Sequence, residues 1–180
     1  MYTNHLLIAM PHMTDQIFSK SVIYVCEHDN QGSMGIIINK PLPTESVQGI
    51  LNETGLDESD SFPQIYFGGP VGMNHGFILH DTKYHIDGTH NISKKIALTS
   101  NLDIIHDLVD GKGPEKYRFA LGYAGWSAKQ IEDEIKHGDW LVIPATPDFI
   151  FNTPDDIKWE SAAKEFGIDM STITGSSGIA

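Results

Sequence analysis

Short apolar runs dominate this chain, and their spacing predicts a series of β-strands. The expected strands are His5–Met10, Ser21–Glu27, Met34–Asn39, Gln64–Gly68, Gly76–His80, Lys95–Thr99, Tyr117–Gly122 and Trp140–Ile143. In the second of these, Val22 and Tyr24 share one face while Ile23 and Val25 share the other. Because both faces are apolar, we expect this strand to be covered on both sides.

Four further segments carry the apolar spacing of helices, followed by residues that end helices. Their apolar stripes are Val47, Ile50 and Leu51 before Gly55; Ile105, Leu108 and Val109 before Gly111; Ile131 and Ile135 before Gly138; and Trp159, Ala162, Ala163 and Phe166. The expected N-terminal caps are Ser100 with Asp103, Ser127 with Gln130, and Thr153 followed by Pro154. Strands come first and then mix with helices, an order that favours an α+β fold.

Length and composition predict a single folded domain spanning residues 1–180. The chain has 180 residues, of which 40% are apolar and 20% are charged, a balance typical of a packed core. The polar stretch Asn52–Pro63 and the tail from Thr174 to Ala180 are the segments that we expect to be loose.

The charge balance argues against direct binding of nucleic acid. The net charge is −12, and Arg118 is the single arginine among twelve basic residues. Phosphate and guanine are read by the arginine fork, and no basic footprint is present in either half of the chain. Partners are therefore expected among proteins or small ligands, and the sequence leaves the oligomeric state open.

Cysteine content and hydropathy predict a soluble cytoplasmic protein. Cys26 is the single cysteine, so neither an internal disulfide nor a Cys-rich zinc site can form. No apolar run reaches the ~20 residues that a membrane-spanning helix needs, and the N-terminus lacks the pattern of a signal peptide.

Three glycine-bearing stretches are the most distinctive local feature. They are Gly35–Pro41, Phe67–Pro70 and Gly122–Ser127. Each contains or follows a strand-like run and then turns through residues that let the backbone approach another group closely. We expect one curled sheet to bring these stretches together around a shared hollow.

These stretches belong to a longer series of motifs that resembles the YqgE/AlgH family. The motifs are HLLIAMP from His5, SVIYVCEH from Ser21, MGIIINKP from Met34, FGGP from Phe67, GFILH from Gly76, ALGYAGW from Ala120 and WL from Trp140. The resemblance runs from His5 to about Asp169. It departs at the end of the chain, where the family's Gly-His-Ala is Gly178-Ile179-Ala180.

The resemblance implies a mixed, mostly antiparallel sheet curled into a pseudo-barrel, with about four helices packed outside. It also implies a link to transcription, because the family is named for a proposed regulator of alginate production. No molecular activity is established for the family, so the resemblance assigns neither a reaction nor a cofactor.

The strongest candidate site is the stretch from Gly122 to Ser127. If a strand ends there and a capped helix begins, unpaired N–H groups could hold an anion. The alternative is that Gly122 and Gly125 only permit close packing. Ser127 is a poor candidate for a nucleophile on a Gly-x-Ser-x-Gly turn, because Lys129 replaces the second glycine. We interpret Ser127 as a helix cap.

A ligand pocket is the wider hypothesis. Its candidate residues are Asn39, Gly68, Gly69, Pro70, His80, Gly122, Gly125, Trp126 and Ser127. The Gly68-Gly69-Pro70 turn could aim backbone N–H groups at a ligand. Asn39 could either line this pocket or simply cap the turn that follows its strand.

The nine histidines do not predict a metal site. His75, His80, His85 and His90 are five residues apart, a spacing that alternates between the faces of a strand. Cys26 and His28 would share a face, with Asp29 beside them, and could form a small ligand site or a nucleophile pair. The alternative is a buried thiol and a strand-end histidine.

Two classes of function follow. The preferred one is a regulatory or interaction module without catalysis, since no complete catalytic set is visible. The alternative is an enzyme or small-molecule binder that uses the glycine loops.

Overall fold

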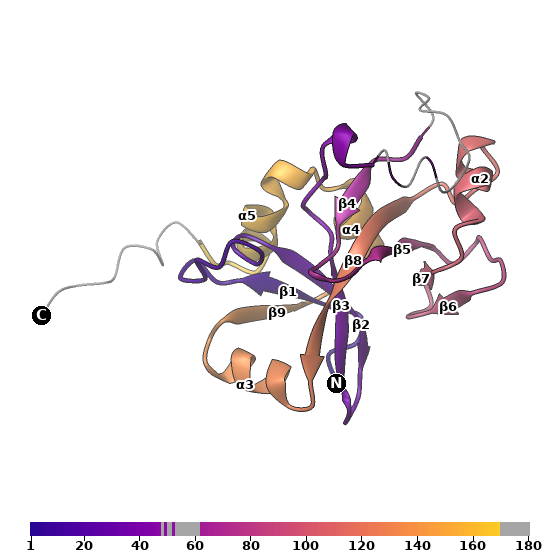
Figure 1. Cartoon of the computed structure of the whole chain (residues 1–180). Coiled ribbons are helices and arrows are strands. Elements are labelled where there is room, and N and C mark those ends of the chain that lie inside the picture. The colour runs from indigo at the N-terminus through magenta and orange to yellow at the C-terminus, as the bar shows by residue number, and fades with distance from the viewer. Residues whose placement is uncertain (48, 50–51, 53–61, 170–180) are drawn as a thin grey trace, which may run out of the picture.

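A curled β-sheet forms the centre of the molecule, with helices at its ends and on its outer side (Figure 1). The computed structural model describes residues 1–47, 49, 52 and 62–169. The predicted helix near Ile50 and the predicted loose tail lie outside these residues. The strands are β1 His5–Ala9, β2 Val22–His28, β3 Gly32–Ile37, β4 Ile65–Phe67, β5 Val71–Asp81, β6 Thr89–Asn91, β7 Ile96–Thr99, β8 Tyr117–Ser127 and β9 Trp140–Pro144.

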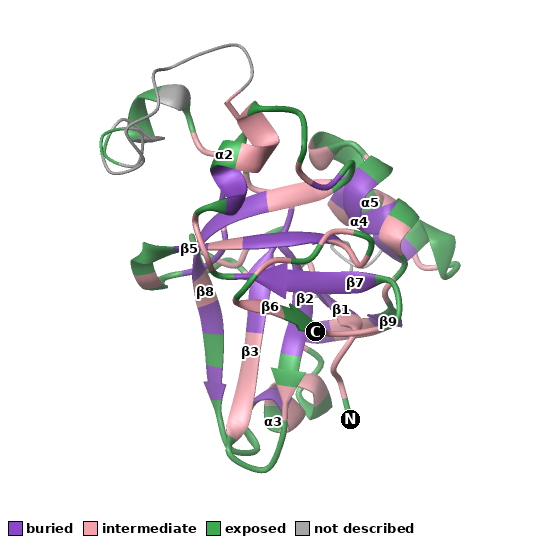
Figure 2. Ribbon diagram, turned by 90° about the vertical axis from the view of Figure 1, so that its right-hand side faces the viewer, coloured by how far each residue is buried: buried purple, intermediate pink, exposed green. Residues whose placement is uncertain are grey.

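The sheet is mixed and mostly antiparallel, as predicted. Its strand order is β6-β7-β5-β8-β3-β2-β1-β9, and β4 joins it by pairing with β8 in parallel. The sheet curls into a half-barrel, so the α+β class and the pseudo-barrel architecture are confirmed. Figure 2 shows β8 running toward the end where α3 lies, with the antiparallel β3 beginning at that end and α4 and α5 at the opposite end.

Strand β2 is covered on both faces, as its sequence predicted. Val22 and Tyr24 belong to a core that the sheet shares with α4 and α5, whereas Ile23 and Val25 belong to a second core beneath α3. All four side chains are fully buried. Two apolar faces therefore fix this strand in the middle of the molecule.

Strand β8 is longer than predicted and carries the site described below. It continues through Gly122 to Ser127, so the turn expected after Gly122 is wrong. Gly122 adopts φ +72° within the strand, a conformation that glycine tolerates, and pairing with β3 begins at Ala124. Strand β5 likewise begins earlier than predicted, at Val71. Strand β6 was not predicted, because its residues are polar and contain no apolar run.

The described residues contain four α-helices and a 3₁₀ turn at Thr44–Val47. The helices are α2 Ile104–Val109, α3 Gln130–Lys136, α4 Pro147–Asn152 and α5 Asp155–Glu165. The short helix α4 escaped prediction because six residues give little periodicity. No helix in the described ranges is long and apolar enough to cross a membrane.

The predicted side-chain caps are wrong at three helix starts. Helices α2, α3 and α5 have no capping hydrogen bond from a side chain. Helix α3 begins after Lys129, which has φ +65°, rather than at Ser127. In α5, Ala162 and Ala163 are buried as predicted, but Phe166 is 48% exposed, since the helix ends at Glu165.

Candidate functional site: a cleft at the end of strands β3 and β8

The three glycine stretches meet where β3, the segment after β4 and β8 come together. The Gly68 N–H donates to the Leu121 carbonyl at 2.7 Å, and the Ile37 N–H donates to the Gly68 carbonyl at 2.9 Å. A Cβ atom added to Gly69 would lie 2.1 Å from the Tyr123 carbonyl carbon, and one added to Gly122 would lie 2.2 Å from the Gly69 oxygen. Glycine is required here for backbone packing.

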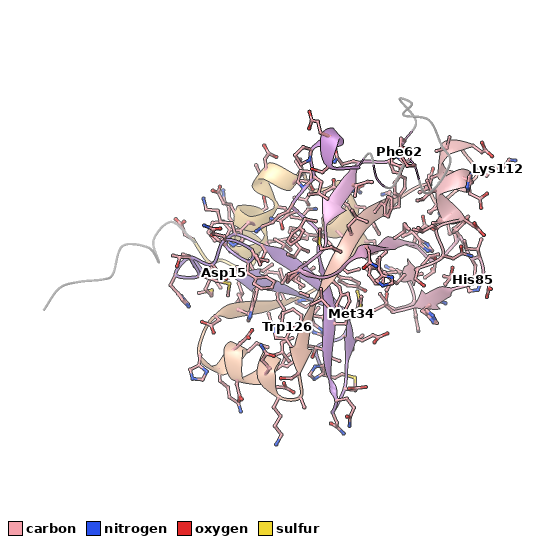
Figure 3. The ribbon with its side chains drawn as sticks, in the orientation of Figure 1. Asp15, Met34, Phe62, His85, Lys112 and Trp126 are labelled. Carbon is pink, nitrogen blue, oxygen red and sulfur yellow. The ribbon has the colours of Figure 1, made fainter. Side chains whose placement is uncertain are left out.

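An open cleft of about 420 Å³ lies beyond this junction, where β8 ends and β3 begins. We call it the hairpin cleft; its lining residues are Glu27, Asp29, Gln31, Gly32, Ser33, Met34, Tyr123, Gly125 and Trp126. Figure 3 places Met34 and Trp126 near each other on the neighbouring strands β3 and β8. Met34, Tyr123 and Trp126 supply apolar surface, while Gly125 has no side chain to fill the space.

The rim of the hairpin cleft is acidic. Glu27 and Asp29 are both exposed and both line it. Asp29 accepts hydrogen bonds from the backbone N–H groups of Gln31 and Gly32, at 2.7 and 3.2 Å, and so shapes the turn between β2 and β3. Among the described residues, neither carboxylate forms an ion pair. The rim therefore attracts cationic groups.

One edge of β8 is open beside this cleft. Residues Ala124 to Ser127 pair with β3 along one edge of β8. Along the other edge, the pairing with β5 extends only as far as the Val71–Tyr123 pair. Within the described ranges, no strand covers that second edge beyond Tyr123. Val71 and Met73, where β5 departs, are each 42% exposed. An edge of this kind can accept a further strand.

The Glu134 carboxylate of α3 holds Trp126, one of the residues that line the cleft. The indole N–H groups of Trp126 and Trp140 both donate to Glu134 Oε2, at 2.9 and 2.8 Å. Since both indoles are almost completely buried, Glu134 satisfies two donors that water does not reach. Helix α3 is thereby fixed against the end of the sheet.

Sequence reasoning missed a β-bulge in β2, next to the residues that line the cleft. The β2–β3 register shifts between Val25 and Glu27, so that Cys26 is the extra residue. Cys26 stays in the core shared with α4 and α5, whereas His28 turns to Ser33, 2.7 Å from its Nδ1, and to Glu132. The predicted shared face is wrong, because a bulge ends strict alternation. Burial also raises the pKa of the Cys26 thiol, which makes it a poor nucleophile.

The predicted site residues fall into three groups. Gly125 and Trp126 line the hairpin cleft, and Ser127 follows at its exposed edge, where its N–H and hydroxyl donate to Gln130 Oε1. Gly68, Gly69 and Gly122 form the junction, with Pro70 exposed beside it.

Asn39 and His80 lie apart from this cleft. Asn39 accepts from the Val22 N–H and donates to the Lys20 carbonyl, each at 2.9 Å, and it lines a different cavity of about 250 Å³ with Lys20 and Lys40. His80 is fully buried near the other end of β8, between the Asp81 carbonyl and the Thr99 hydroxyl, and burial lowers its pKa.

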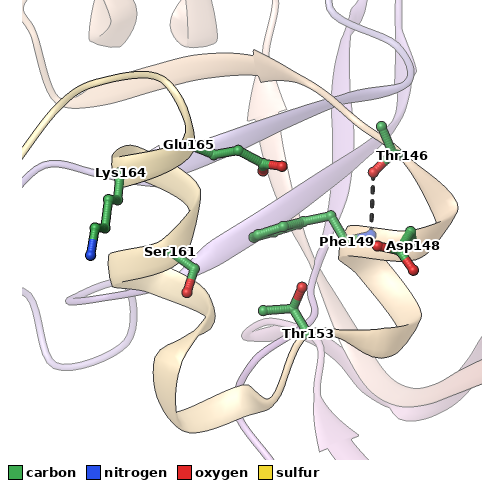
Figure 4. Close-up of a pocket in the computed structure, with 7 residues that line it drawn as sticks. All are labelled: Thr146, Asp148, Phe149, Thr153, Ser161, Lys164 and Glu165. Carbon is green, nitrogen blue, oxygen red and sulfur yellow. Dashed lines mark hydrogen bonds between the residues drawn. The ribbon is translucent and has the colours of Figure 1, made fainter.

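A separate cavity of about 360 Å³ lies between α4 and α5 (Figure 4). Thr146 caps α4 there by accepting from the Phe149 N–H at 3.2 Å. Lys164 and Glu165 lie across from it on α5. No group of three or more potential metal ligands occurs within the described residues.

Comparison with known proteins gives a consistent result along nearly the whole chain. A family model described as AlgH-like matches residues 6–171. A UPF0301 protein of Vibrio cholerae is 41% identical, covering 98% of this chain and 97% of its own length. A UPF0301 protein of Proteus mirabilis is 39% identical and covers 97% of each chain.

Two solved structures are similar in fold. The solution structure of the AlgH protein from Pseudomonas aeruginosa has a TM-score of 0.79 and 37% identity, over 99% of this chain and 96% of that one. A crystal structure of a Corynebacterium diphtheriae protein has a TM-score of 0.73 at 20% identity, over 92% and 87%.

Proposed function

Because the chain belongs to the AlgH-like family, we propose that it is a non-catalytic regulatory module that binds a segment of a partner protein. The partner segment is extended and carries basic residues, and it adds as a strand at the hairpin cleft. The protein acts in the cytoplasm, in keeping with its single, buried thiol.

The observation that carries this proposal is the open edge of β8 at Ala124–Ser127 beside an acidic rim. Strand addition supplies backbone hydrogen bonds, and the cleft supplies specificity for side chains that alternate along the added strand. Apolar side chains suit the surface of Met34 and Tyr123, and basic ones suit Glu27 and Asp29.

The negative net charge of the protein also favours regulation through a protein partner over direct contact with DNA. With a net charge of −12, the protein is repelled by the phosphate backbone, so direct contact with DNA would need compensation from another molecule. A partner that itself binds DNA would supply the missing positive charge.

Site-specific photocrosslinking tests the proposal. A photoreactive phenylalanine analogue at Gln31, which is exposed and lines the cleft, captures a discrete protein partner in bacterial cells. The same analogue at the exposed Lys94, outside the cleft, does not. Glu27→Lys lowers the yield at Gln31 at least tenfold, because it reverses a charge on the rim.

Asp87→Lys makes the same charge reversal at an exposed position outside the cleft and leaves the yield unchanged. Equal yields at Gln31 and Lys94, or no effect of Glu27→Lys, would contradict binding at the cleft. Binding of DNA by the pure protein at physiological salt would contradict the protein-mediated mechanism. Saturable binding of a metabolite in the cleft, with no partner captured, would favour the small-ligand alternative.

A further inference from the structure

The single arginine of this acidic chain lies near the start of β8, far from the hairpin cleft. The Arg118 side chain is only 15% exposed. Its Nη2 donates to the Phe151 carbonyl at 3.1 Å, its Nη1 donates to the Tyr117 carbonyl at 3.3 Å, and its guanidinium carbon lies 5.2 Å from the centre of the Tyr66 ring. Burying a guanidinium is costly unless its donors and its charge are matched.

The hydrogen-bonding capacity around Arg118 is incompletely used. Its Nε is buried and has no hydrogen-bond partner in the described part of the chain, and the same is true of Asp155 Oδ1. That oxygen lies 3.9 Å from Arg118 Nη2, while Oδ2 accepts the Tyr66 hydroxyl at 2.7 Å. A guanidinium has five N–H groups, and the two carbonyl contacts leave several of them available.

A second cation lies behind the first. Lys158 is fully buried, and its Nζ donates to the carbonyls of Phe149 and Ile150, each at 3.0 Å. Arg118, Lys158 and Asp155 together carry a net charge of +1 in a protein of net charge −12. This largely buried cluster therefore has an excess of positive charge.

A cavity of about 390 Å³ opens beside this cluster. It lies where β8 passes α4, and Figure 1 shows the two elements. Its lining residues are Gln64, Tyr66, Glu115, Lys116, Tyr117, Arg118, Phe151 and Asn152. Three aromatic rings, from Tyr66, Tyr117 and Phe151, supply flat apolar walls, and Arg118 supplies the buried charge. Gln64, Glu115, Lys116 and Asn152 form its exposed, polar side. Aromatic walls beside a fixed charge can hold a small molecule, and the volume lies in the usual range of such sites.

We propose that this cavity binds a small aromatic carboxylate, whose carboxylate meets Arg118 while its ring lies among Tyr66, Tyr117 and Phe151. The planar guanidinium matches a carboxylate with two hydrogen bonds. A single negative charge balances the net charge of the cluster, whereas a phosphate dianion would leave an excess negative charge beside Glu115. This site is separate from the cleft and does not depend on the proposed protein partner.

The single arginine makes the test direct. Arg118 contributes the one arginine Nε–H signal in a ¹⁵N-resolved NMR spectrum of the whole protein, so its identity needs no assignment. Titration with benzoate shifts this signal saturably. Benzamide, which has the same ring without the charge, leaves it in place, and inorganic phosphate binds at least tenfold more weakly. An equal response to benzamide or to phosphate would overturn the proposal.

Two matched lysines locate the site without disturbing the core. Lys116 and Lys112 are both exposed, but only Lys116 lines the cavity. Lys116→Glu weakens benzoate binding about fivefold or more, while Lys112→Glu leaves it unchanged. Equal effects of the two reversals would show that benzoate responds only to overall charge.

Arg118→Gln, with folding checked by circular dichroism, abolishes binding; a folded variant that still binds benzoate would overturn the assignment.

Discussion

The two ends of strand β8 differ in both pairing and charge. The half that begins at Tyr117 has β5 on one side and β4 on the other, and it carries Arg118 against a buried lysine. The half that ends at Ser127 pairs with β3 alone beyond Tyr123, and it borders an acidic rim. One end therefore has unbalanced buried positive charge and the other has exposed negative charge and an open edge.

This contrast teaches that one strand can support two unlike recognition surfaces. A cavity with aromatic walls and one largely buried guanidinium suits a small anion, whose charge can pair with the guanidinium. An open edge with an acidic rim suits a longer cationic segment, which can stay partly hydrated. The glycine junction at Gly122 separates the two halves and fixes their relative position.

The largest effect is expected from closing the space at that junction. Gly122 and Gly138 have similar positive φ values, +72° and +79°, but only Gly122 would place a Cβ against backbone, 2.2 Å from the Gly69 oxygen. Gly138→Ala therefore loses about 1 kcal/mol for its backbone conformation. Gly122→Ala adds a backbone clash and loses about 4 kcal/mol or more, or fails to fold.

Urea denaturation of the two variants measures this difference. Equal losses of unfolding free energy would mean that the backbone at Gly122 relaxes easily. The two halves of β8 would then not be held rigidly to each other, and a ligand at one end could change the other.

A smaller effect is expected from Glu134, which secures the cleft half of β8. Glu134→Ala leaves the indole N–H groups of Trp126 and Trp140 buried without an acceptor, at a cost of about 3 kcal/mol. Glu134→Gln keeps an oxygen acceptor and loses about 1 kcal/mol. Denaturation followed by tryptophan fluorescence measures both values.

Asp133→Ala is the matched control on the same helix. Its ion pair with Lys136 is exposed and long, at 3.9 Å, so its removal changes the stability by less than about 0.5 kcal/mol. A loss in Glu134→Ala no larger than in Asp133→Ala would mean that the two indoles find water, and that α3 is not fixed by this carboxylate.

The sequence predicted the fold better than the sites, for physical reasons. Continuous apolar runs such as Val22–Val25 report burial directly, so most strands were located to within a few residues. Glycine is ambiguous, because the freedom that ends one strand lets β8 continue through Gly122. The bulge at Cys26 depends on pairing with β3, which no local pattern reports.

The cavity at Arg118 was beyond prediction for a different reason. The sequence makes Arg118 conspicuous as the single arginine, but its neighbours Phe151 and Asp155 lie more than 30 residues away along the chain. Lys158 looks like an ordinary polar position of α5, and its burial against the carbonyls of α4 appears only in the folded chain. By contrast, Tyr123 lies between two glycines of a predicted stretch, and its position there could have indicated the cleft.

The smallest effect is a pH dependence that tests the positive charge near Arg118. Burial, with a contribution from the Arg118 charge, lowers the pKa of Lys158 to about 8, whereas an unfolded lysine titrates near 10.4. Below pH 8 the lysine is charged in both states, so the cost of burying its charge is fully present. Above pH 8 the folded protein loses the proton first, and this cost is relieved as the pH rises.

The protein should therefore gain about 1 to 2 kcal/mol in unfolding free energy between pH 7 and pH 9.5, relative to Lys158→Met. Taking the difference between the two proteins removes titrations that both share, such as those of the buried tyrosines. Urea denaturation at several pH values measures it. If the difference in unfolding free energy between the two proteins does not change with pH, Lys158 keeps an ordinary pKa. If the difference falls as the pH rises, the charge of Lys158 is stabilised in the folded protein. Either result would mean that the folded protein does not disfavour the charge on Lys158, and would contradict an excess of positive charge around Arg118.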